Sequence, residues 1–219
     1  MKQLPNARFQ AAFLVSPCRG KAASRLAILC GIACGFAIFV APARAQQSVY
    51  TLDPAQTKIE FTVDSTLHTV HGTFQLKSGS VQFDPASGAA SGAIVVDAAS
   101  GNSDNSSRDK KMHEYVLEVL QFPEVTFTPG HVKGAIAPSG SSQISVSGKF
   151  RLHGVDHDIT MPFNVQHLSG NQLRADTQFD VPFLDWGLRD PSNFLLHVAR
   201  LVHVQITATG TLAPASEAR

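Results

Sequence analysis

The stretch QISVSGKFRLHGVDHDITMPFNVQHL, residues 143–168, alternates between apolar and polar residues on both sides of a short turn. Because successive side chains of a strand point to opposite faces, this alternation predicts an antiparallel hairpin with one buried face. Pro162 falls on the outer side, where it predicts an edge, a bulge or a gap in strand pairing. The side chains predicted to point inward are Ile144, Val146, Gly148, Phe150, Leu152, Ile159, Met161, Phe163 and Val165.

The same period of two continues over most of the chain from Tyr50 onward, with Gly, Pro, Ser and Asp between the apolar runs. It predicts an all-β domain of about eight antiparallel strands, which would form either a sandwich or a closed barrel. The further residues predicted to point inward are Ile59, Phe61, Val63, Val70, Gly72, Phe74, Leu76, Val81, Phe83, Ile94, Val96, Val125, Phe127, Phe179, Val181, Val202, Val204, Ile206 and Ala208.

One stretch departs from this pattern. RDKKMHEYVLEVLQ, residues 108–121, carries Met112, Tyr115 or Val116, and Val119 at helical spacing. It predicts a single short amphipathic helix that ends before the following Phe-Pro pair, because the residue before a proline disfavours helical geometry.

Residues 1–45 have a different composition from the rest of the chain. Scattered basic residues precede the apolar run LAILCGIACGFAIFVA, residues 26–41, and an Ala-x-Ala sequence follows at positions 43–45. This order predicts a secretory signal peptide cleaved after Ala45, which leaves residues 46–219 as one mature domain. The apolar run is shorter than the ~20 residues that span a bilayer as a helix. We therefore expect a periplasmic protein with no membrane span after cleavage.

Cleavage of the signal peptide changes the chemistry of the protein. It removes all three cysteines, Cys18, Cys30 and Cys34, so we expect no disulfide and no thiolate site in the mature domain. It also removes six of the 18 Lys and Arg residues, which leaves 12 bases against 17 acids and a net charge of −5. An acidic domain without a basic cluster argues against nucleic acid as a partner.

The sequence holds no recognised catalytic motif, such as a nucleophile elbow, a phosphate-binding glycine loop or a zinc-protease helix. The turn from His153 to Asp158 gathers two histidines and two aspartates, which could supply nitrogen and oxygen ligands to a metal. A metal site needs three or four converging ligands, so the simpler interpretation is that these side chains are solvated. We expect no metal, no cofactor and no catalytic activity.

Two further features each allow two interpretations. Arg108 and Asp109 either form an ion pair at the start of the helix or form a polar gate over a ligand pocket. The phenylalanine-rich interior is either an ordinary packed core or an elongated apolar cavity for a chain-like lipid. Composition alone does not separate these alternatives.

Six segments follow one another over residues 50–212: YTLDPAQTKIEFTV, VHGTF, VQFDPASG, NSSRDKKMH, FPEVTFT and GKFRLHGVDHDITMPF. In this order and spacing they resemble the YceI-like lipid-binding family. The resemblance implies a lipocalin-like antiparallel β-barrel with one short helix. It also implies a non-catalytic periplasmic protein whose partner is an isoprenoid, quinone-like or other long apolar lipid, and it allows a homodimer.

The resemblance also implies a set of ligand contacts. Arg108 and Asp109 take the place of the family's Arg-Asp pair at the helix start and would form a polar mouth. The segment from Asp185 to Ile206 departs from the commonest family form. Two alternatives remain, namely a metal-dependent protein or enzyme that uses the turn from His153 to Asp158, and a ligand-free, stress-related barrel. The residues expected to bind lipid are Phe61, Phe74, Phe83, Phe127, Phe150, Met161, Phe163, Phe179 and Trp186.

Overall fold

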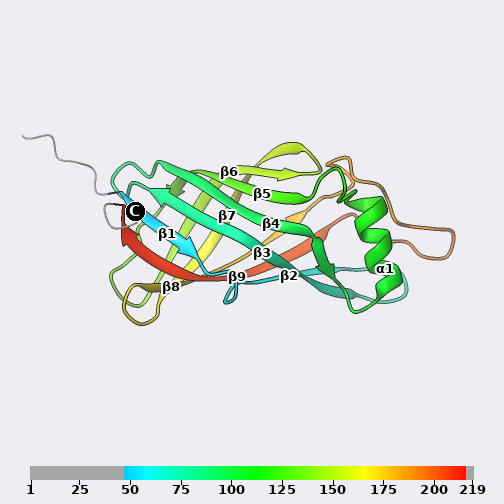
Figure 1. The fold of residues 1–219 in the computed structure, drawn as a ribbon, viewed down its shortest axis with the longest axis horizontal. Coiled ribbons are helices and arrows are strands. Elements are labelled where there is room, and N and C mark those ends of the chain that lie inside the picture. The colour runs from blue at the N-terminus through cyan, green and yellow to red at the C-terminus, as the bar shows by residue number, and fades with distance from the viewer. Residues whose placement is uncertain (1–46, 216–219) are drawn as a thin grey trace, which may run out of the picture. The chain divides into compact units, whose positions relative to one another are not determined.

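The computed structural model describes residues 47–215, so the predicted signal peptide lies outside the described residues. Within these residues, nine strands form one antiparallel sheet (Figure 1). None of the helices in this part of the chain has the length and apolarity needed to cross a membrane. The strands are β1 (Ser48–Leu52), β2 (Lys58–Val63), β3 (Val70–Phe83), β4 (Ala90–Asn102), β5 (Glu124–Lys133), β6 (Ser141–Leu152), β7 (Val155–His167), β8 (Gln172–Val181) and β9 (Val202–Pro214).

The sheet closes on itself because β3 pairs with β4 at one side and with β1 and β2 at the other. Strands β1 and β2 both pair with β3 and β9, and they occupy one position end to end, separated by the turn at residues 53–57. The result is an antiparallel barrel with eight strand positions. The predicted barrel of about eight strands is confirmed, and the alternative of a sandwich is wrong.

The hairpin at residues 143–168 forms as predicted, by β6 and β7. Its turn residues His153 and Gly154 both have positive φ, at 51° and 78°, as a two-residue type I′ turn requires. Pairing between β7 and β8 extends only from His167 to Asn164, two residues short of Pro162. The predicted gap in pairing is therefore confirmed, and the Thr177 hydroxyl donates to the Pro162 carbonyl oxygen at 2.6 Å where the ladder stops.

The inward parity changes in the middle of β3. Even-numbered residues point inward as far as Leu76, whereas odd-numbered residues, including Gly79 and Phe83, are buried beyond it. A register shift against β4 between Leu76 and Ser78 accounts for this change, because a bulge inserts one extra residue and exchanges the two faces. One continuous strand therefore buries both Leu76 before the bulge and Phe83 after it, although these two residues have opposite parity.

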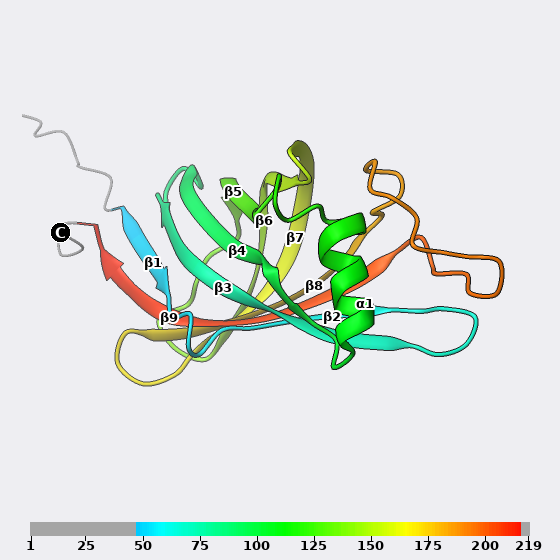
Figure 2. The same ribbon diagram turned by 45° about the vertical axis from the view of Figure 1, so that its right-hand side comes forward.

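Helix α1 (Ser106–Lys111) lies across one end of the barrel and continues into a π-helical turn, η1 (Met112–Val116) (Figure 2). The side chain of Asn105 caps its start by accepting a hydrogen bond from the Arg108 amide at 3.0 Å. The prediction that the helix continues to Gln121 is wrong. Glu118 has φ of 48°, which is left-handed geometry that a helix cannot contain, and its carboxylate binds His153 and Arg189.

The interior is packed solid at the end of the barrel away from α1. Side chains from all parts of the sheet meet there in two adjoining clusters with Met161 and Val165 among the most buried. The buried members of these clusters are Leu52, Ile59, Leu76, Phe83, Phe127, Val132, Val146, Met161, Val165, Leu173, Ala175 and Ala208.

Tyr50 of β1 supplies the polar anchor of this packed end. Its hydroxyl lies 3.0 Å from the carbonyl oxygen of Ala208 and 3.2 Å from that of Leu173. Burial, assisted by the negative charge of Asp176, raises the pKa of Tyr50 well above its ordinary value near 10. The phenol therefore stays protonated in the folded protein at pH values where it ionises in the unfolded chain.

We predict that the Tyr50→Phe variant is less stable than the wild type below pH 10. This difference in the free energy of unfolding should shrink as the pH rises above 10. Below that pH the hydroxyl contributes about 0.5–1.5 kcal/mol through its hydrogen bond. As the pH rises from 10 towards the folded-state pKa, only the unfolded chain releases the proton, so wild-type stability falls by up to ~1.4 kcal/mol per pH unit relative to the variant. Urea unfolding between pH 8 and pH 11 measures this difference, and a constant difference would contradict the assignment.

Candidate functional site

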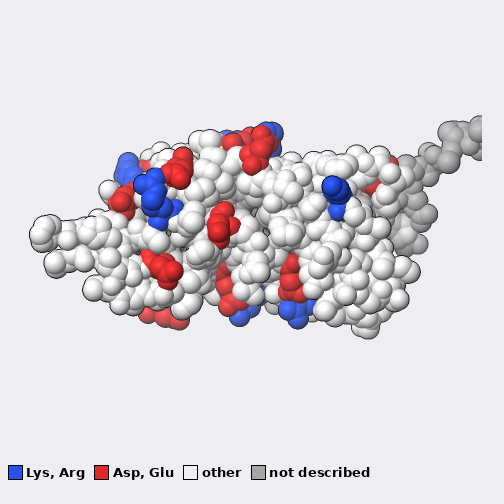
Figure 3. All heavy atoms as spheres, turned by 180° about the vertical axis from the view of Figure 1, so that it is seen from behind, with Lys and Arg blue, Asp and Glu red and all other residues white. Residues whose placement is uncertain are grey.

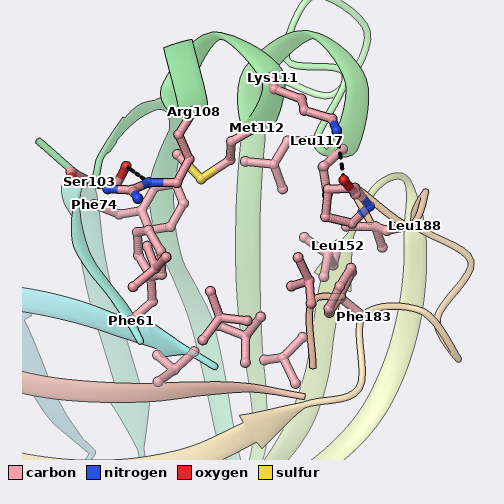
Figure 4. A pocket seen from close by; sticks show the side chains of 18 of the residues that line it. Phe61, Phe74, Ser103, Arg108, Lys111, Met112, Leu117, Leu152, Phe183 and Leu188 are labelled. Carbon is pink, nitrogen blue, oxygen red and sulfur yellow. Dashed lines mark hydrogen bonds between the residues drawn. The ribbon is translucent and has the colours of Figure 1, made fainter. Parts of the chain in front are cut away.

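The barrel is hollow at the end that α1 covers (Figure 4). The cavity has a volume of about 510 Å³, within the range of ~300–1,000 Å³ that is usual for small-molecule sites. Its walls are formed by β2, β3, β4, β5, β6, β8 and β9, and its cover consists of α1, η1, the loop between β2 and β3 and the long segment between β8 and β9. The hollow half begins where the packed half of the interior ends.

The walls of the cavity are apolar, and two glycines leave room for the Phe61 and Phe74 rings to lie close to the sheet. A Cβ atom on Gly72 would lie 2.3 Å from the Phe61 ring, and one on Gly101 would lie 2.7 Å from the Phe74 ring. The two rings, 5.2 Å apart between centroids, therefore lie back against the sheet. The strand residues that line the cavity are Ile59, Phe61, Val63, Val70, Phe74, Val96, Val125, Phe150, Leu152, Phe179, Val181, Val202, Val204 and Ile206.

The cover of the cavity is also largely apolar. Met112, Val116 and Leu117 reach it from the helical segment. The segment between β8 and β9, residues 182–201, contributes six further lining residues, and its Leu188 belongs to the same buried cluster as Leu152 at the edge of the wall. Its lining residues are Phe183, Leu188, Pro191, Asn193, Leu196 and Val198.

Arg108 and Asp109 both bind Ser103, a buried residue just after β4. The Arg108 guanidinium donates from Nε to Ser103 Oγ at 2.7 Å and from Nη2 to Ser103 O at 2.6 Å. The Asp109 carboxylate accepts hydrogen bonds from the amide of Ser103, at 3.0 Å, and from its hydroxyl. Ser103 therefore fixes the start of α1 to the end of the barrel wall. Arg108 lines the cavity, whereas Asp109 does not.

The other polar groups at the cavity come from the same end. Lys111 Nζ donates to the carbonyl oxygen of Pro191 at 2.6 Å, and His68 Nε2 lies 3.4 Å from Arg108 Nη1. No aspartate or glutamate is among the described residues that line the cavity. Its mouth therefore presents N–H donors and positive charge, and the rest of its surface is almost entirely apolar.

The structure separates the side chains that the sequence analysis assigns to lipid binding into three places. Phe61, Phe74, Phe150 and Phe179 line the cavity together with Arg108. A second group, Phe83, Phe127, Met161 and Phe163, packs together in the solid half of the barrel. Trp186 lies outside the lining, stacked on His157 with 4.0 Å between ring centroids, and its ring is 5.7 Å from that of Phe150.

Sequence reasoning missed the lining residues of the cover. Leu188, Leu196 and Val198 lie in a segment without strand or helix period, so no alternation marks them. The available signal was composition, since PFLDWGLRDPSNFLLHV, residues 182–198, is too apolar for an ordinary exposed loop.

The histidines and aspartates of the turn between β6 and β7 take separate partners. His153 Nε2 lies 2.7 Å from Glu118 Oε2, while Asp156 pairs with Arg151 and Asp158 with Lys149 on the exposed surface. Over residues 47–215, no group of three or more His, Cys, Asp or Glu side chains is placed so that it could hold a metal ion. The geometry of this turn therefore gives no support to a metal centre.

We predict that Ser103→Ala loosens the helix over the cavity mouth. The change removes the acceptor of Arg108 Nε and one of the two donors to Asp109, and a buried group left without its partner costs about 1–3 kcal/mol. Hydrogen exchange of the amides in residues 105–117 should therefore speed up by about tenfold or more, while the strand amides of β6 and β7 remain protected. Ser106→Ala, an exposed change in the same helix, should leave these rates unchanged; equal rates in both variants would refute the role of Ser103.

Comparisons with known proteins place these observations in context. The family model for the YceI-like domain matches residues 50–210. The crystal structure of BcnA from Burkholderia cenocepacia is 19% identical, has a TM-score of 0.60, and the match covers 73% of this chain and 99% of that one. A polyisoprenoid-binding domain from Saccharophagus degradans, implicated in plant cell wall breakdown, is 19% identical with a TM-score of 0.58 and coverage of 75% and 98%. Among curated protein sequences, none matches.

Proposed function

The chain belongs to the YceI-like family, and on that premise we propose that it is a non-catalytic periplasmic protein that holds a long-chain isoprenoid or other amphiphilic lipid inside its barrel. The observation that carries this proposal is the cavity of about 510 Å³, which is apolar throughout except at its mouth. The description of the Saccharophagus domain as polyisoprenoid-binding supports the choice of ligand class. The signal peptide predicted at residues 1–45 supports the periplasmic location.

The lipid tail would occupy the inner part of the cavity. There it would contact Phe61, Phe74, Phe150 and Phe179, whose rings come from four different strands of the wall. Each Å² of apolar surface removed from water contributes about 25 cal/mol, so a branched hydrocarbon chain gains affinity with no hydrogen bond along its length. The packed cluster around Met161 closes the far end, so a long chain would either fold within the cavity or leave part of its length at the mouth.

The polar end of the lipid would lie at the mouth beside Arg108 and Lys111. Both side chains are hydrogen-bond donors without acceptor capacity, and no carboxylate of the described lining competes for them. A head group that accepts hydrogen bonds, such as a hydroxyl, a quinone carbonyl or a phosphate, therefore fits this end. In this proposal Asp109 acts indirectly, because it binds Ser103 and so holds Arg108 in place.

The two alternatives from the sequence have less support. A ligand-free barrel with a packed interior conflicts with the hollow half of the molecule. A metal-dependent function of the turn from His153 to Asp158 has no observation in its favour, because the side chains of this turn point to separate partners.

We predict that Val204→Phe weakens isoprenoid binding by filling part of the cavity. Val204 is the register partner of both Phe61 on β2 and Phe179 on β8, so a larger side chain there projects between two lining rings. Affinity for geranylgeraniol should fall by about tenfold or more, a loss of ~1.4 kcal/mol or more, because the ligand and the new ring compete for the same volume. Fluorescence of Trp186, the one tryptophan of the chain, provides the measurement, since its ring lies 5.7 Å from that of the lining residue Phe150.

The matched control is Gln205→Phe, the same new side chain on the adjacent residue of β9, whose own side chain is exposed. This variant should bind geranylgeraniol with wild-type affinity. If Val204→Phe also binds normally while both variants remain folded by circular dichroism, the ligand does not occupy the barrel and the proposed function is wrong.

A further inference from the structure

Two loops project beyond the end of the barrel that α1 covers, and they lie side by side (Figures 1 and 2). One joins β2 to β3 at residues 64–69, and the other is the segment between β8 and β9, residues 182–201. A β-bridge joins Ser65 to Val198, and the Thr66 amide donates to the His197 carbonyl oxygen at 3.0 Å. The two loops therefore form one bonded unit.

The tips of these two joined loops carry three exposed apolar side chains, which we call the apolar lip: Leu67, Phe194 and Leu195. Their exposed fractions are 71%, 95% and 78%. Residues 65–69 and 191–199 contain no Lys, Arg, Asp or Glu. The face in Figure 3 shows a projecting end that is bare of charged side chains. Exposure of a large aromatic and two leucines at one place is costly in water, so a partner that removes them from water is expected.

The apolar lip is continuous with the mouth of the cavity. Ser65 and His68 on one loop, and Asn193 and Leu196 on the other, line the cavity, while the residues between them form the lip. Each loop thus presents one group of side chains to the cavity and another to the outside. A molecule that covers the lip therefore also lies directly at the cavity mouth.

Behind the lip lies a group of side chains of the kind found at membrane–water interfaces. The Tyr115 ring is half exposed, with Lys111 Nζ 5.9 Å and the Arg189 guanidinium 5.3 Å from its centroid. Lys111 also binds the carbonyl oxygen of Pro191, which ties this group to the base of the longer loop. Tyrosine, lysine and arginine combine an apolar body with a polar end and are favoured at the level of lipid head groups.

We propose that the apolar lip inserts into the surface of a lipid bilayer and brings the cavity mouth into contact with it. This inference rests on the proposed function, because a long-chain lipid is dissolved in a bilayer and must leave it or enter it at such a contact. The lip is a pair of projecting tips, a shape suited to insertion between lipids, whereas a second copy of the chain or a protein partner calls for a broader complementary face.

The charge around the lip indicates how it would attach. Asp64 and Asp190 flank the uncharged tips in the sequence, as do Arg189 and Arg200, so the residues next to the lip favour neither sign. The positive charge of Arg108 and Lys111 lies at the cavity mouth behind the lip. Attachment therefore depends on apolar insertion and needs no anionic lipid. Binding to vesicles of pure phosphatidylcholine should respond little to salt, because screening acts on charge pairs and not on apolar burial.

Flotation of the mature protein with phosphatidylcholine vesicles tests the proposal. The triple variant L67S/F194S/L195S should partition onto vesicles about tenfold less than the wild type, or weaker still, because three large apolar groups no longer enter the interface. Leu168→Ser is the matched control, since this exposed leucine lies in the loop between β7 and β8 at the opposite end of the barrel. It should float as the wild type does.

Binding of geranylgeraniol in solution, followed through Trp186, separates this inference from the proposed function. The triple variant should bind the alcohol with wild-type affinity, because the lip residues do not line the cavity. Wild-type protein that binds the alcohol but not vesicles, or a triple variant that floats normally, would overturn the docking surface alone. The docking surface would also be wrong if the three substitutions changed only the formation of a dimer, measured by sedimentation, and left vesicle binding unchanged. Wild-type protein that floats through the lip but does not bind the alcohol would support docking and refute the proposed function.

Discussion

Closure of the sheet by pairing of β3 with β4 is the constraint on which the rest of the structure depends. A closed antiparallel sheet satisfies its backbone hydrogen bonds in the wall and directs every second side chain into one interior of limited width. Strands must bend to close, and three features provide that freedom: the bulge in β3, the break between β1 and β2, and the part of β7 before Asn164, which pairs with β6 but not with β8. Each of these irregularities exchanges local hydrogen bonds for a barrel that closes.

The two halves of the interior differ because large side chains meet at one end and lie back against the wall at the other, which also has a separate cover. At the packed end, Phe83, Phe127 and Met161 meet near the centre, and Tyr50 spans the remaining space to reach backbone carbonyls. At the hollow end half of the strand residues that line the wall are valines, and the large Phe61 ring lies back over Gly72. The helix does not fill this half, since Ser103 holds it at the rim. An unfilled apolar space with donors at its entrance is the physical basis of the proposed function.

Much of the fold could be predicted from alternation, but only part of the site could be. The period of two predicted which side chains enter the barrel, including Val146 and Met161, which are buried. It could not predict the level at which they lie, because that depends on register between strands far apart in the sequence. Phe127 and Phe150 are register partners on β5 and β6, yet only Phe150 lines the cavity. The cover around Leu188 follows no period, so alternation could not predict it. The helical spacing of the sequence continues past Glu118, but the helix ends there because the Glu118 backbone is left-handed and its carboxylate binds His153 and Arg189.

The central claim is that the hollow half of the barrel holds a lipid. The most direct test is native mass spectrometry of the full chain expressed with its own leader and purified without detergent. The account predicts the mass of the mature polypeptide plus one long-chain lipid per barrel, which collisional activation releases as a single species of defined mass. A spectrum that contains only the mass of the polypeptide, from protein that still does not take up an isoprenoid added in excess, would contradict it.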